Sequence, residues 1–200
     1  RSPEDRVVAC LASPRRGRTG SIARVLVDVS AGVRALLGHL NDLGCRDALD
    51  RVLPPLTTTD VATELAAAGV PVTQALVEWY SAWGGQAADG VLGMMDVIPG
   101  FYALALRDAL AHRASRRWPA EWFPLLADGG GDFFVLASSS PVAPVLRVRY
   151  EDPEPERTSA TLADFLDAID RAFSEGVIYT SDGYLDQDDR AWRELLGVDA

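Results

Sequence analysis

The chain has 200 residues, 48% of them hydrophobic, which is enough to bury one substantial core. Its formal net charge of -10 disfavours nucleic acid as a partner of the folded part, because an acidic surface repels phosphate groups. All 19 basic residues are arginine, so site types that require lysine, such as the P-loop or a Schiff base, are excluded.

The charge is unevenly distributed along the chain. Residues 1–24 carry six arginines against two acids, a net charge of +4, and their lack of periodicity predicts a flexible basic arm. Residues 25–200 are expected to form one domain. Residues 151–200 carry fourteen acids against four arginines, a net charge of -10, which favours a basic partner. No apolar run of about 18 residues and no signal peptide is evident, so we expect a cytoplasmic protein with no membrane span.

Apolar residues at helical spacing predict four helices in the first half of the chain. The first covers 33–43, with Ser30 as its N-cap and Gly44 after its end, and a short one follows near 49–53. The third and fourth are expected to form an αα-hairpin, with caps and terminators at Thr57, Gly69, Thr73, Gly84 and Gly85.

The middle of the chain predicts strands. A short strand near 93–96 and a turn at Pro99-Gly100 precede a helix over 104–117. Apolar and alternating runs then predict strands at 122–127, 133–137 and 145–150.

The last third predicts one amphipathic helix over 161–175, because its apolar residues form a continuous stripe. A strand at 177–180, a turn at Asp182-Gly183 and a short final helix capped by Asp188 or Asp189 follow. Helices segregated from antiparallel strands indicate an α+β fold.

Between two hydrophobic strands lies the most informative segment, the loop Asp128, Gly129, Gly130, Gly131 and Asp132. A glycine-rich loop that cradles phosphate leads into a helix N-terminus, whereas this loop leads into a strand with no basic residue after it. A Ca²⁺ site needs six or more oxygen ligands, more than two aspartates supply. We therefore interpret the loop as a structural hairpin turn whose Asp side chains bond turn amides.

No set of catalytic residues, cofactor ligands or metal ligands is evident. Only His39 and His112 are present, both within predicted helices, and Cys10 and Cys45 form neither a disulfide framework nor a zinc site. A metal-dependent enzyme built on the two Asp loops, 128–132 and 182–189, is a less favoured alternative.

Partner contact is predicted at two places: around the exposed turn between two tryptophans, and on an acidic loop. Aromatic residues at a turn are enriched in protein interfaces, and an acidic patch attracts a basic protein. The candidate partner-binding residues are Trp118, Glu121, Trp122, Glu151, Asp152, Glu154 and Glu156.

Three segments, taken in order, resemble the SUKH superfamily, specifically the bacterial relatives of the yeast Smi/Knr cell-wall-assembly regulators. They are DVATELAAAGVPVTQALVEWYSAWGG, then IPGFYALALRDAL with WFPLLADGGGDFFVL, and finally LADFLDAIDRAFSEGVIYTSDGYLD, and together the match covers about residues 33–197. The resemblance implies an α+β domain whose mixed, mainly antiparallel sheet of about five to six strands is packed by N-terminal helices and a late C-terminal helix.

The resemblance also implies a function. It implies no catalytic residues and no cofactor, and bacterial members of the superfamily are commonly immunity proteins that neutralise a toxin. We therefore expect a non-enzymatic, protein-binding domain, with regulation of cell-wall glucan synthesis as the alternative role. The expected partner is a toxin domain or a cell-wall synthesis factor.

Overall fold

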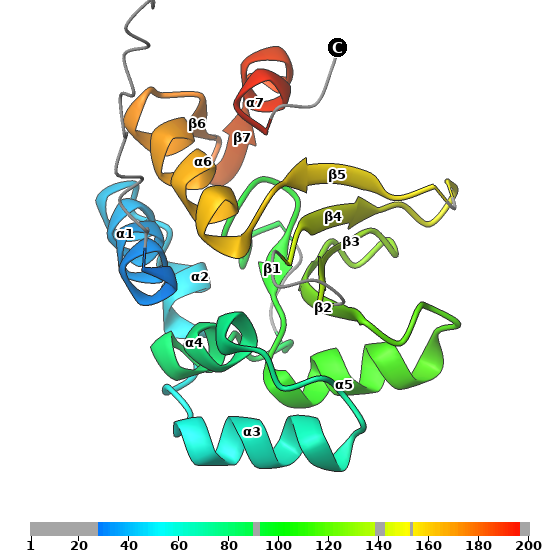
Figure 1. Ribbon diagram of the computed structural model, residues 1–200. Helices are drawn as coiled ribbons and strands as arrows, with labels where there is room; N and C mark the ends of the chain where they lie inside the picture. The colour runs from blue at the N-terminus through cyan, green and yellow to red at the C-terminus, as the bar shows by residue number, and fades with distance from the viewer. Residues whose placement is uncertain (1–27, 90–92, 139–142, 153, 197–200) are drawn as a thin grey trace, which may run out of the picture.

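The computed structural model describes residues 28–89, 93–138, 143–152 and 154–196 (Figure 1). The predicted basic arm, residues 1–24, lies outside the described residues, and so does the start of the predicted domain at residue 25.

The helices lie before or after a central run of four antiparallel strands in the described chain, which confirms the α+β prediction. The helices are α1 (Val29–Asp42), α2 (Arg46–Asp50), α3 (Thr58–Ala67), α4 (Gln74–Ala82), α5 (Leu106–Ser115), α6 (Leu162–Ser174) and α7 (Asp189–Leu196). The strands are β1 (Tyr102–Ala103), β2 (Trp122–Ala127), β3 (Phe133–Ala137), β4 (Val145–Val148), β5 (Glu156–Ser159), β6 (Ile178–Ser181) and β7 (Tyr184–Gln187).

The main sheet is a five-stranded meander in chain order, β1-β2-β3-β4-β5, and each neighbouring pair is antiparallel. The expected mixed sheet is therefore wrong for these strands; the parallel pairing found in the described residues is an isolated bridge between Gln86 and Leu104. Strands β6 and β7 form a separate hairpin. Its turn lies at Asp182-Gly183, as the sequence predicts, and both residues have positive φ.

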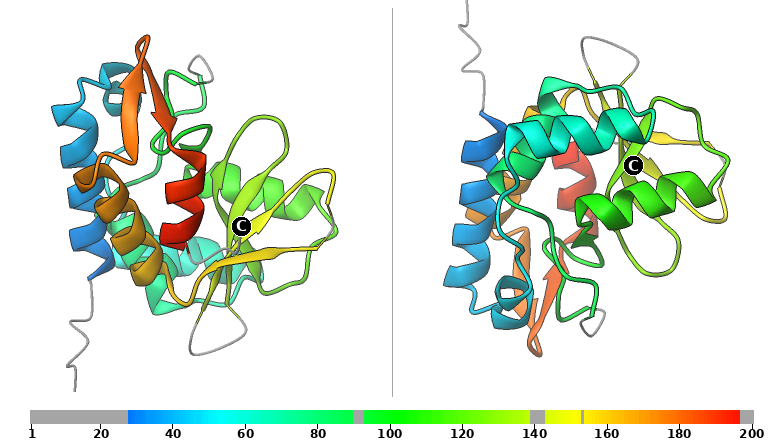
Figure 2. Two further views of the ribbon diagram at one scale, coloured as in Figure 1. Left: turned by 90° about the horizontal axis from the view of Figure 1, so that it is seen from above. Right: turned by 90° about the horizontal axis from the view of Figure 1, so that it is seen from below.

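Helices cover both faces of the main sheet, which is why every residue of β3 is buried. On one face, Phe133 contacts His112 of α5, with the ring centroids 5.1 Å apart. On the other face, Phe134 contacts Phe165 of α6 at the same centroid distance, 5.1 Å. Helices α1 to α4 lie beside this layered part of the molecule (Figures 1 and 2).

Helix α6 also packs against α1, so it joins the helical part of the molecule to the sheet. His39 Nε2 on α1 lies 2.8 Å from Asp170 Oδ1 on α6, and the His39 ring stacks on Phe173. At Gly32 the helices approach so closely that an added Cβ would lie 2.7 Å from the Cβ of Leu166. A glycine is required there because no other residue leaves the space.

Helix starts are where the sequence is most informative. The side chains of Thr57, Thr73 and Thr161 each accept a hydrogen bond from the backbone N–H three residues on, as N-caps do. Ser30 was the expected N-cap of α1, and that expectation is wrong. Asp28 is the cap instead, and its carboxylate accepts from the Ser30 N–H at 2.9 Å.

Several predicted boundaries are corrected. Residues 93–96 form turns rather than a strand, and the strand of this region is β1. Helix α5 begins at Leu106 instead of Leu104, because the Leu104 N–H donates to the Leu125 carbonyl of β2. Glu156, expected in the acidic loop, belongs to the unpredicted strand β5.

The side chain of Gln86 is fully buried and joins segments that are far apart in the sequence. Its Nε2 donates to the carbonyls of Ala48 and Met95, both at 2.9 Å, and its Oε1 accepts from the Ala103 N–H at 2.8 Å. Its own backbone N–H donates to the Ala103 carbonyl. The hydrogen-bonding capacity of the amide is well used, so its burial is stabilising rather than costly.

Replacing Gln86 with leucine removes three buried hydrogen bonds and leaves the Ala103 N–H without its acceptor. We expect Gln86→Leu to lower the free energy of unfolding by about 3 kcal/mol or more, measured by urea denaturation. The matched control is Gln74→Leu at an exposed position. We expect it to change the free energy of unfolding by about 0.5 kcal/mol at most. Similar small effects from both variants would show that Gln86 does not hold these segments together.

Candidate functional site

The loop from Asp128 to Asp132 joins β2 to β3 and is held by its first aspartate. Asp128 Oδ1 accepts hydrogen bonds from the backbone N–H groups of Gly130, Gly131 and Asp132, at 2.7, 2.8 and 2.9 Å. These three donors are satisfied by the protein's own carboxylate. The loop therefore does not present them to a phosphate group.

The last aspartate of the loop fastens it to the end of β4. Asp132 Oδ1 accepts from the Tyr150 N–H at 2.9 Å, and its Oδ2 lies 3.3 Å from the Arg147 guanidinium. At Gly131, where φ is +115°, an added Cβ would lie 3.1 Å from the Tyr150 ring. The glycine therefore lets the tyrosine lie directly against the loop.

Replacing Asp128 with alanine leaves three loop N–H groups without their acceptor. We expect Asp128→Ala to lower the free energy of unfolding by about 1–3 kcal/mol, measured by chemical denaturation. The control is Asp152→Ala, because Asp152 accepts one comparable bond, from the exposed Glu154 N–H. A control effect as large as that at Asp128 would contradict a special role for the loop carboxylate.

Gly84 and Gly85 lie where the chain leaves α4 and passes between two other segments. The Gly85 carbonyl accepts from the Leu53 N–H, and the Gly84 N–H donates to the Leu53 carbonyl. A Cβ on Gly84 would overlap the Pro54 carbonyl oxygen, and one on Gly85 would overlap that of Leu104. Both positions thus need glycine for a close backbone approach.

The predicted partner-binding residues are spread over two neighbouring surfaces. Trp118 and Trp122 are half-buried and line the same groove. Glu121 is half-buried, and its backbone carbonyl accepts from the Ser138 hydroxyl at 2.7 Å. The acidic loop supplies three exposed carboxylates, those of Glu151, Asp152 and Glu154. Glu156, at the start of β5, is half-buried and pairs with Arg149.

We call the groove around the two tryptophans the aromatic–arginine groove. Its volume is about 500 Å³, and it is lined by Arg116, Arg117, Trp118, Pro119, Trp122, Gly131, Val148, Arg149 and Tyr150. The Arg116 guanidinium carbon lies 4.4 Å from the centroid of the Phe133 ring and 5.3 Å from that of Trp118. Arg116 is thus half-buried against two aromatic rings.

His112 lies next to this groove, and its ring is inclined by 63° to that of Phe133. Burial lowers the pKa of His112, and the charge of Arg116 lowers it further, while Asp108 opposes both effects. The folded protein therefore favours the neutral imidazole.

The shifted pKa of His112 predicts a pH dependence of stability. In the unfolded chain His112 takes up a proton near its ordinary pKa of about 6.5, whereas the folded chain takes it up only at lower pH. The contribution of neutral His112 to the free energy of unfolding is therefore complete above the pKa of the unfolded chain and is lost as the pH falls below it. The free energy of unfolding should be measured by urea titration at pH 7.5 and at pH 5. We expect it to fall less between these pH values for His112→Phe, which keeps the ring contact, than for the parent. Equal losses would contradict this role.

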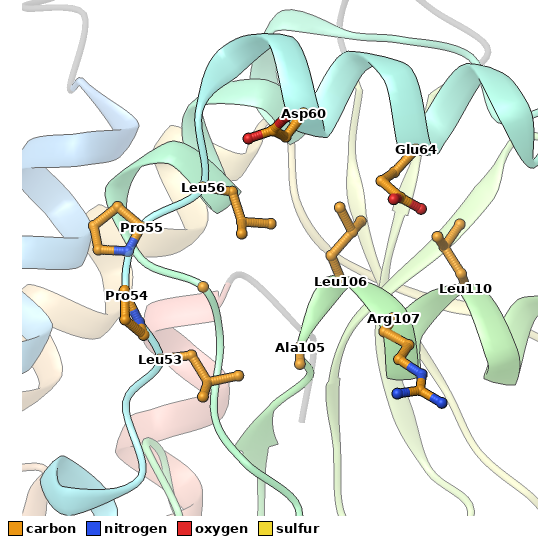
Figure 3. A pocket seen from close by; sticks show the side chains of 11 residues that line it. Leu53, Pro54, Pro55, Leu56, Asp60, Glu64, Ala105, Leu106, Arg107 and Leu110 are labelled. Carbon is orange, nitrogen blue, oxygen red and sulfur yellow. The ribbon is translucent and has the colours of Figure 1, made fainter.

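A second groove, the α3–α5 groove, is formed by segments far apart in the sequence (Figure 3). Its volume is about 640 Å³, and it is lined by Leu53, Pro54, Pro55, Leu56, Asp60, Glu64, Gly84, Ala105, Leu106, Arg107 and Leu110. Leu106 and Leu110 point from α5 toward α3, and Glu64 points from α3 toward them. The groove thus has apolar walls with carboxylates on its α3 side.

Fixed contacts set the spacing between α3 and α5. The Leu56 N–H donates to the Tyr80 carbonyl, which holds the start of α3 against α4. The Leu104 N–H bonds β2, which fixes the start of α5. The two helices lie side by side on the lower surface of the molecule (Figure 2). The sequence did not indicate this groove, since no local pattern shows which apolar residues remain uncovered.

The Asp-rich segment near the C-terminus serves the local backbone. Asp188 is the N-cap of α7, accepting from the Arg190 and Ala191 N–H groups, as predicted for Asp188 or Asp189. Across the described residues, no group of three or more His, Cys, Asp or Glu side chains could hold a metal ion.

None of the helices in the described ranges is both long and apolar enough to cross a membrane. Comparisons with models of protein families and with curated proteins find no match for this chain. The SUKH resemblance therefore stays a prediction.

Proposed function

We propose that this chain is a non-enzymatic, cytoplasmic protein-binding domain that acts as an immunity protein, neutralising a toxin in the manner of bacterial SUKH members. The observation that carries the proposal is the α3–α5 groove, with its apolar walls and its carboxylates. A concave, mainly apolar groove with a few charged groups at its rim is a common kind of binding site.

The shape and charge of the groove favour a helix with basic residues. Helix α3 has 10 residues and so is about 15 Å long, which accommodates two to three turns of a second helix lying beside it. Apolar side chains at intervals of three and four residues would contact Leu56, Leu106 and Leu110. Arginine or lysine next to that stripe would lie near Asp60 and Glu64, and the net charge of -10 would attract it.

The same groove supports a regulatory scaffold of cell-wall glucan synthesis, the alternative that the SUKH resemblance implies. The identity of the partner separates the two roles. The partner of an immunity protein is a toxin domain encoded beside it, whereas a scaffold would bind a cell-wall synthesis factor.

A metal-dependent enzyme is the third candidate. Calorimetry with Ca²⁺ and Mg²⁺ tests it directly. A binding heat together with a rise in melting temperature would favour this candidate over a protein-binding domain.

The direct test is co-purification of the full chain with the toxin-like product of an adjacent gene, followed by measurement of the Kd. We expect Glu64→Arg and Leu110→Asp each to weaken binding by about tenfold or more, the first by charge reversal and the second by adding a charge to the apolar wall. The control is Asp167→Arg, because Asp167 is exposed on α6, away from the groove.

The outcomes test the docking site, the role of the protein and the folding of the variants. Binding that is insensitive to both groove variants would exclude the α3–α5 groove as the docking site. Binding to a cell-wall enzyme instead of a toxin would favour the regulatory scaffold. Melting temperatures of the variants close to that of the parent show that lost binding is not lost folding.

A further inference from the structure

The aromatic–arginine groove has a composition opposite to that of the rest of this acidic chain. Three arginines and three large aromatic side chains line it. Tyr150 is 74% exposed, the most exposed of the large hydrophobic residues described, although its backbone is bonded to Asp132 and its ring lies against Gly131. An aromatic side chain held in place but left in solvent is a typical binding contact.

Two of the three arginines keep their hydrogen-bond donors unused. Among the described residues, neither Arg116 nor Arg117 forms a side-chain hydrogen bond or an ion pair, whereas Arg149 pairs with Glu156 at 2.9 Å. The Nε of Arg116 is buried without a partner. The guanidinium lies over the rings of Phe133 and Trp118, which restricts its position. A fixed guanidinium with free donors is suited to bind a carboxylate through two parallel hydrogen bonds.

The groove continues into a smaller hollow of about 170 Å³ that shares Arg116, Gly131 and Tyr150 with it. The hollow is bordered by three further aromatic side chains, Tyr102, His112 and Phe133. An aromatic ring of a ligand could therefore lie beside Arg116 while a carboxylate bonds its guanidinium.

The surrounding charges favour a peptide over a nucleic acid. Glu151 and Asp152 follow Tyr150 directly and are exposed, so an anionic ligand can pair with the arginines only over a short stretch, away from these two carboxylates. Two unpaired arginines can neutralise one or two carboxylates. A polyphosphate backbone needs more cations than these residues supply.

We infer that the aromatic–arginine groove is a second binding site, for an acidic peptide segment of a protein that carries an aromatic side chain next to its carboxylates. The site uses the C-terminal end of α5, whereas the α3–α5 groove uses Leu106 and Leu110 from the same helix. The two sites therefore take partners of opposite charge, and this inference does not depend on the proposed function.

The test uses the full-length, ¹⁵N-labelled protein and the acetylated, amidated hexapeptide EFEDFE. The indole N–H resonances report on each tryptophan separately. We expect those of Trp118 and Trp122 to shift saturably, while those of the buried Trp79, Trp83 and Trp192 stay in place. The peptides KFKKFK and EAEDAE and a single-stranded hexauridylate serve as comparisons.

Variants identify the arginines that bind the carboxylates. We expect Arg116→Met, which keeps the contact with Phe133, and Arg117→Gln each to weaken EFEDFE binding about tenfold. The matched control is Arg34→Gln, at an exposed position on α1, which should leave peptide binding unchanged. Glu64→Arg should also leave it unchanged, because Glu64 lies in the α3–α5 groove. If Arg116→Met does not fold, the exposed Arg117→Gln decides the question.

Several results would overturn the inference. The first is that EFEDFE causes no saturable shifts at Trp118 and Trp122. The second is that KFKKFK or hexauridylate binds as tightly as EFEDFE or more tightly. The third is that the arginine variants do not change the affinity for EFEDFE. Tight binding of EAEDAE would show that the aromatic side chain of the peptide is not recognised, which would also contradict the inference.

Discussion

The buried amide of Gln86 connects the helical part of this molecule to its sheet. Its side chain bonds three backbone groups, at Ala48 after the start of α2, at Met95 in the following loop, and at Ala103 in β1. Gly84 and Gly85, just before it, allow the backbones to approach. Because the segments joined there lead toward α3 and α5, this crossing helps to fix the width of the α3–α5 groove, together with the Leu56–Tyr80 and Leu104–Leu125 backbone bonds.

Local signals explain which elements the sequence predicts well. Threonine caps and glycine terminators locate α3, α4 and α6, and hydrophobic runs around the Asp128–Asp132 loop locate β2 and β3. Strand β5 escapes prediction because its residues, Glu-Arg-Thr-Ser, are polar and its order comes from pairing with β4. Gln86 shows no local signal either, since a polar residue in a segment without periodicity is ordinarily exposed.

The residues of the two candidate grooves also differ in how far the sequence predicts them. Trp118 and Trp122 are recognisable from the sequence because aromatic residues flank a turn, but the neighbouring role of Arg116 depends on Phe133. In the α3–α5 groove, Leu56 and Leu110 are ordinary apolar positions of a helix start and a helix face. Only the packing of α3 away from α5 leaves them uncovered, and packing of distant segments is a tertiary property.

The outer edges of the meander have a consequence for self-association. An unpaired strand edge offers a row of backbone donors and acceptors to another molecule, and so promotes fibre formation. At β1 the backbone of Gln86 already bonds Ala103, so part of that edge is occupied within the chain. At the opposite edge β5 is only four residues long and carries Glu156 and Arg157. Short, charged edges discourage edge-to-edge strand pairing between molecules, so this sheet has little tendency to extend from one molecule into the next.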